Sequence, residues 1–116
     1  MSFQISSKTV DPDVTVVKLT GQLSLGLSLS QAEDFFRELA ARSVKKVVLD
    51  LSDLHYVDSA GLGTLAQAAA LLTKSGGKTC FAAAGPRVSR ILQITHIERV
   101  VPIHADVAAA VNSLTS

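Results

Sequence analysis

Residues 46–51, KVVLDL, form a short and almost continuous apolar run that is rich in β-branched side chains. A run of this kind is typical of a strand that is covered on at least one face. A helical pattern follows at residues 59–75, and Gly76 and Gly77 end it. Its apolar stripe consists of Leu62, Leu65, Ala66, Ala69 and Leu72. A buried strand that leads into an amphipathic helix is a building unit of parallel sheets.

The same alternation continues along the chain after an opening β-hairpin with a turn at residues 11–13 (DPD). Strands are predicted at residues 3–6, 14–19, 46–51, 78–84 and 100–103, and helices at 30–42, 59–75, 86–94 and 106–114. Ser30 and Glu33 fit a capping box at the start of the first helix. The order ββαβαβαβα predicts an α/β fold with right-handed crossovers and a mostly parallel sheet, as one domain over residues 1–116.

Composition narrows the classes of function. Hydrophobic residues make up 47% of the 116 residues, which is enough for a core without a disulfide or metal. A net charge of +1 and only five Phe and Tyr residues argue against nucleic-acid binding. No segment is long and apolar enough to span a membrane, and the N-terminus does not resemble a signal peptide. We therefore expect a cytoplasmic protein, in which Cys80 is a buried and inert thiol.

The stretch YVDSAGLGT, residues 56–64, is the most unusual in the chain. Gly61 and Gly63 match part of a dinucleotide fingerprint, G-x-G-x-x-A. Both glycines, however, fall inside the predicted helix rather than in the turn before it. No Asp or Glu occurs between Asp58 and Glu98 to bind a ribose. These two departures argue against a nucleotide cofactor.

Other catalytic motifs also fail. GGKT at residues 76–79 ends like a phosphate-binding loop, but it leads from a helix into a strand, the reverse of the required order. A serine-hydrolase elbow needs glycine where Val57 stands. His55, His96 and His104 show no spacing typical of a catalytic base or a metal site. We therefore expect a protein that is not an enzyme and has no metal or cofactor.

Two roles remain for Ser59, and both use the same hydroxyl. A serine at a strand-to-helix junction is a good N-cap. A hydroxyl at a helix N-terminus can also be phosphorylated without unfolding the helix, because the helix dipole accommodates the added charge. The interval between residues 59 and 97 has no acidic residue but carries Lys74, Lys78, Arg87 and Arg90. A basic face beside a switchable anion would suit a partner that binds only one state.

The segment VVLDLSDLHYVDSAGLGTL resembles the core of the STAS domain, the fold of bacterial anti-sigma factor antagonists, in which an apolar strand leads into Asp-Ser-Ser/Ala-Gly. The likeness extends from about Val14 to Leu114. It implies a mixed, mostly parallel sheet of four to five strands with helices packed mainly on one face. It also implies that Ser59 is phosphorylated by a serine-kinase-type anti-sigma factor and restored by a PP2C-like phosphatase. The unphosphorylated form would bind the kinase and free a sigma factor.

The resemblance further implies a partner-binding segment made of Asp58, Ser59, Ala60, Gly61, Leu62 and Gly63. Asp58 would orient the loop, and the two glycines would shape the docking surface. An alternative within the family is a scaffold or accessory subunit of another complex, such as a stressosome-like assembly or a lipid-transport ATPase, with Ser59 only a helix cap.

One stretch departs from the family pattern. Gly21-Gln22-Leu23-Ser24 stands where the family often has Gly-Asp/Glu-Leu-Asp, and an apolar loop follows. The leucines of this loop are expected to be partly buried against the first helix, with a contact surface as the alternative. They are Leu23, Leu25, Leu27 and Leu29.

Overall fold

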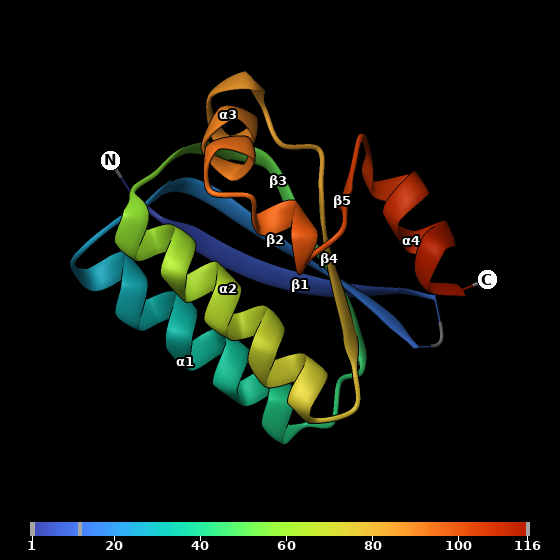
Figure 1. Ribbon diagram of the computed structural model, residues 1–116. Coiled ribbons are helices and arrows are strands. Elements are labelled where there is room, and N and C mark those ends of the chain that lie inside the picture. The colour runs from blue at the N-terminus through green and yellow to red at the C-terminus, as the bar shows by residue number, and fades with distance from the viewer. Residues whose placement is uncertain (1, 12, 116) are drawn as a thin grey trace.

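The computed structural model describes residues 2–11 and 13–115 and contains a five-stranded sheet in the order β1-β2-β3-β4-β5 (Figure 1). The elements are β1 (Gln4–Asp11), β2 (Val14–Leu23), α1 (Leu27–Ala41), β3 (Lys46–Val57), α2 (Ser59–Lys74), β4 (Lys78–Ala82), α3 (Pro86–Ile94), the 3-10 helix η1 (Ile97–Arg99), β5 (Ile103–His104) and α4 (Val107–Thr115). β1 pairs antiparallel with β2, and the other pairs are parallel. The predicted fold class is confirmed. The predicted turn at residues 11–13 contains Pro12, which lies outside the described residues.

The helices cover the two faces of the sheet unequally. Side chains alternate along β3, so that Val47, Leu49 and Leu51 join the core beneath α1, α2 and α3. Val48 points the other way and packs with Cys80 and residues of α4. Three helices therefore share one face while α4 lies alone on the other, as Figure 1 shows. No helix among the described residues is long and apolar enough to cross a membrane.

β3 is twice as long as predicted. It continues through residues 52–57, beyond the predicted end at residue 51. Leu54 and Val57 are buried in this extension, whereas Ser52, His55 and Tyr56 are exposed. Because this part of the strand is only partly covered, its exposed polar residues interrupt the apolar pattern from which the strand was predicted. The extension ends one residue before α2. The second half of β2 pairs in parallel with it, with register shifts along the pair.

The start of α1 also differs from the prediction. The helix begins at Leu27 rather than near Ser30, its N-cap is Gly26, and no side chain caps it. The predicted capping box of Ser30 and Glu33 is therefore wrong. Gly26 has a φ of 128°, a left-handed conformation that glycine adopts easily and that turns the chain into the helix early. The Ser28 hydroxyl donates to the Ser24 carbonyl oxygen at 2.8 Å and accepts from the Ser24 amide at 3.1 Å.

The last strand is short and later than predicted. β5 covers only Ile103–His104 instead of residues 100–103, because η1 occupies Ile97–Arg99 and leaves Val100 exposed. β4 correspondingly pairs with β5 only through Phe81 and Ala82 and ends two residues before the predicted limit.

Cys80 lies in the sheet beneath α4 and is almost inaccessible, with 1% of its surface exposed. Burial raises the pKa of its thiol, so the reactive thiolate is rare at neutral pH. We expect iodoacetamide to alkylate the folded protein at least about tenfold more slowly than the unfolded chain. Intact-mass spectrometry with and without denaturant measures this ratio. Equal rates would show that α4 does not stay packed on the sheet.

Candidate functional site

Asp58 is the residue that caps α2. It adopts an extended conformation directly before the helix, and its Oδ1 accepts a hydrogen bond from the Gly61 amide at 2.7 Å. Its own amide donates to the Leu23 carbonyl oxygen at 3.3 Å. The expectation that Ser59 could cap the helix is therefore wrong, whereas the scaffold or accessory-subunit role is not tested by this contact. The aspartate precedes the serine in the chain, and either residue type is an effective N-cap.

Ser59 is the first residue of α2 and is exposed. Asp58 already satisfies the Gly61 amide, so the helix does not need the serine hydroxyl. The amides of Ser59 and Ala60 belong to the first turn, where no intrahelical acceptor exists. An anion attached to Ser59 would therefore lie beside the amides of the first turn and the positive end of the helix dipole.

The second carboxylate oxygen of Asp58 reaches a different element. Oδ2 accepts a hydrogen bond from the Leu25 amide at 3.0 Å, in the loop between β2 and α1. The amides of Leu25 and Gly61 lower the pKa of Asp58 below its ordinary value. At neutral pH a single carboxylate therefore holds the loop and the start of α2 together.

The two glycines of the segment play different structural roles. Gly61 is buried, and a methyl group in its place would overlap the Leu23 carbonyl oxygen and lie 2.8 Å from Val57 Cγ2. Gly63 is exposed, and a methyl group there would meet nothing within 4 Å. Gly61 lets α2 approach the end of β2, whereas no contact within the described chain requires Gly63.

Comparison with known proteins places this geometry in a family. The family model for the STAS domain matches residues 6–110. The chain belongs to the STAS domain family. Its sequence is 28% identical over 102 residues to the anti-sigma F factor antagonist of Paenibacillus polymyxa, covering 88% of this chain and 85% of that protein.

Solved structures share the fold of this STAS chain. An anti-sigma factor antagonist from Mycobacterium paratuberculosis superposes with a TM-score of 0.85 at 24% identity, over 99% of this chain and 96% of that one. The antagonist SpoIIAA has been solved in its unphosphorylated form, with a TM-score of 0.71 at 19% identity over 99% of both chains. Its phosphorylated form gives a TM-score of 0.71 at 18% identity, over 97% of this chain and 98% of that one.

The predicted partner-binding segment of the STAS chain divides between surface and core. Ser59 and Gly63 are exposed, and they lie one helical turn apart on the same side of α2. Asp58 and Ala60 are half-buried, whereas Gly61 and Leu62 are buried. Direct contact with a partner can therefore involve Ser59, Ala60 and Gly63, while the other three residues hold the surface in place. Their partner-binding role stays a prediction.

The four basic residues do not form one face beside Ser59. Lys74 ends α2, about 22 Å from Ser59 at 1.5 Å of rise per residue, and Lys78 starts β4 near that far end. Arg87 is the second residue of α3, which follows the carboxyl end of β4 at the same end of the strands as Ser59. Its guanidinium carbon lies 5.8 Å from the centroid of the Tyr56 ring. Lys74 and Lys78 therefore lie away from Ser59. Arg87 and Arg90, in contrast, both belong to α3, so the four residues do not share one basic face.

The four leucines between residues 23 and 29, which were expected to form a loop, differ in their exposure. Leu23 is buried and Leu29 is half-buried. Leu25 and Leu27 expose 80% and 76% of their surfaces. The expectation of partial burial is correct for the first pair and wrong for the second. Sequence periodicity placed the start of α1 too late and so missed that these two side chains point into solvent beside the site.

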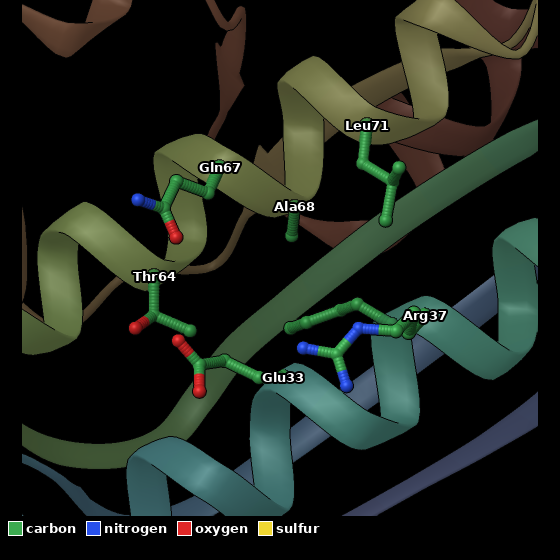
Figure 2. Close-up of a pocket in the computed structure, with 7 residues that line it drawn as sticks. Glu33, Arg37, Thr64, Gln67, Ala68 and Leu71 are labelled. Atoms are coloured by element: carbon green, nitrogen blue, oxygen red, sulfur yellow. The ribbon is translucent and has the colours of Figure 1, made fainter.

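The groove between α1 and α2 holds a small hollow of about 90 Å³ (Figure 2). Glu33 and Arg37 approach it from α1, and Thr64, Gln67 and Leu71 from α2. The Thr64 hydroxyl donates to the Ala60 carbonyl oxygen, and Arg37 pairs with Asp34. This volume is below the roughly 300 Å³ that is usual for a small-molecule site. The hollow is therefore a poor candidate for a ligand site.

Proposed function

We propose that this chain is an anti-sigma factor antagonist whose exposed Ser59 is phosphorylated by a serine-kinase-type anti-sigma factor. The unphosphorylated protein binds that kinase and releases a sigma factor in the cytoplasm. A PP2C-like phosphatase hydrolyses the phosphoserine and restores the binding form. The name of the Paenibacillus polymyxa relative, an anti-sigma F factor antagonist, supports this assignment. So does the existence of SpoIIAA in unphosphorylated and phosphorylated forms.

The proposal rests mainly on the different structural roles of Asp58 and Ser59. Asp58 caps the helix, and Ser59 stands exposed beside it. The hydroxyl can therefore receive the γ-phosphoryl group of ATP, with ADP as the leaving group and the hydroxyl proton passed to the kinase, without the loss of a structural hydrogen bond. The chain supplies the acceptor and its surroundings, and the kinase supplies the catalytic groups.

Electrostatics explains how one phosphate can block binding. Phosphoserine carries roughly two negative charges at neutral pH. It would lie next to the ionised Asp58, whose oxygens are already occupied by the Leu25 and Gly61 amides. A partner that fits the neutral hydroxyl would have to desolvate these charges without a cation to pair them, which is unfavourable.

The test uses purified kinase-type anti-sigma factors of the host organism, each in turn. With ATP, one of them should add a single phosphate to the wild type and none to Ser59→Ala, as measured by intact mass. Ser59→Asp should bind that kinase at least about tenfold more weakly than the wild type, a difference of about 1.4 kcal/mol. Ser59→Ala should bind like the wild type and change the free energy of unfolding by no more than about 0.5 kcal/mol.

Two results would contradict the proposal. A kinase that phosphorylates another residue would remove Ser59 from the mechanism. Equal affinity of wild type and Ser59→Asp would favour a constant docking role in a scaffold or accessory subunit.

A further inference from the structure

The β2–α1 loop and the first residue of α1 present two leucines beside the Ser59 site. Leu25 and Leu27 are 80% and 76% exposed, which is unusual for side chains of this size. They rim a hollow of about 400 Å³ whose other lining residues include Phe3, Gln22 and Gln31. We call Leu25, Leu27 and this hollow the leucine surface. Among the residues that the structure describes, none that lines the hollow is charged.

The leucine surface is held in a fixed relation to the start of α2. The Leu25 amide donates to Asp58 Oδ2, and Asp58 Oδ1 caps α2 directly before the exposed Ser59. Gly26 and the paired hydrogen bonds between Ser24 and Ser28 fix the rest of the turn. The N-terminal ends of α1 and α2 lie at the same end of the molecule (Figure 1). A partner that covers Ser59 therefore meets the leucines as well.

The polar groups of this region are neutral or already engaged. Gln22, near the end of β2, and Ser24, directly after that strand, are both uncharged. The nearby carboxylate, Asp58, directs both oxygens to backbone amides. A partner with a basic patch would find no free anion to pair with on the leucine surface. An apolar side chain would gain the burial of the two exposed leucines, while the uncharged polar residues of the hollow offer it no ion pair.

We infer that the leucine surface is the second half of the docking surface, and that it receives an apolar anchor side chain of the kinase partner. This inference rests on the proposed function and adds the chemistry by which the partner is selected. Ser59 then reports the phosphorylation state, while Leu25 and Leu27 determine which kinase is recognised. Recognition by burial rather than by ion pairing also predicts an affinity that depends weakly on salt.

The experiment measures binding of the kinase that phosphorylates Ser59, by calorimetry, to single variants. Leu25→Asp and Leu27→Asp should each weaken binding at least tenfold, because each removes a buried leucine and places a carboxylate in an apolar contact. Val100→Asp is the matched control, since Val100 is 78% exposed and lies beside the second half of α2. It should bind like the wild type. Between about 0.05 and 0.5 M NaCl the wild-type affinity should change by less than about threefold.

The outcomes separate this inference from the proposed function. If Ser59→Asp loses binding while both leucine variants bind like the wild type, the docking role of the leucines is wrong and the switch stands. A tenfold or larger loss of affinity over this range of NaCl would show that the partner is recognised through charge, and would contradict the inference. Because both side chains are exposed, the variants should fold. Should either unfold, Leu25→Ala and Leu27→Ala replace them, and a smaller loss of affinity is expected. Alanine variants that bind like the wild type would then contradict the inference.

Discussion

Gly61→Ala should lower the free energy of unfolding by about 3 kcal/mol, because overpacking at a rigid contact has a cost of this order. The new methyl group would overlap the Leu23 carbonyl oxygen, which belongs to the backbone and also accepts the Asp58 amide. Relief requires α2 to move away from the end of β2. Urea denaturation followed by circular dichroism measures the change.

Gly63→Ala is the matched control, two residues along the same helix. Alanine should raise the free energy of unfolding by up to about 1 kcal/mol, because glycine is the poorer helix former and a methyl group meets nothing here. The same variant should weaken binding of the kinase if the partner approaches the bare backbone at Gly63. Equal destabilisation by the two alanines would mean that the space around Gly63 is filled, contrary to the structure.

Asp58→Ala should lower the free energy of unfolding by about 2 kcal/mol, since it removes the cap of α2 and the acceptor for the Leu25 amide. Asp58→Asn should have a smaller effect than Asp58→Ala, because the amide side chain keeps one carbonyl oxygen that can still accept from one of the two backbone amides. Hydrogen exchange distinguishes the two contacts: in the alanine variant the Leu25 amide should lose protection. Unchanged protection would show that the loop is held by other contacts.

The contribution of Asp58 should also depend on pH. The Leu25 and Gly61 amides lower the pKa of the folded state, so the ionised form stabilises the fold. This stability is present in full above the unfolded-state pKa of about 3.9. It is lost progressively as the pH falls from there through the lower folded pKa. The difference in unfolding free energy between wild type and Asp58→Asn should therefore shrink as the pH falls below about 4, and a constant difference would contradict the assignment.

Much of the fold was predictable because its strands and helices have clear periodicities. The run at residues 46–51 and the stripe from Leu62 to Leu72 predicted a buried strand followed by a helix, and both exist. Element ends were predicted less well. β3 extends to Val57 and α1 begins at Leu27, since strand pairing and a glycine with positive φ decide these limits rather than hydrophobic pattern.

The position of the candidate site was predictable from the sequence, but the separate roles of Asp58 and Ser59 were not. The Asp-Ser-Ala-Gly segment between strand and helix marked Ser59, because hydroxyls and carboxylates at such a junction find free amides. Which of the two neighbours caps the helix depends on backbone dihedral angles. Only the tertiary structure assigns that role to Asp58 and leaves Ser59 exposed.

The order of elements, the mostly parallel sheet and the position of the serine were predictable from the chain alone, because they follow from local patterns of polarity. Tertiary structure decided the properties that depend on contacts across the chain. It gave the two glycines different roles, because the Leu23 backbone leaves no room for a side chain at Gly61, whereas Gly63 faces open space. It also placed Lys74 and Arg87 on different helices, far from each other. It also brought the Leu25 amide to Asp58 from 33 residues away, and so placed two exposed leucines beside Ser59.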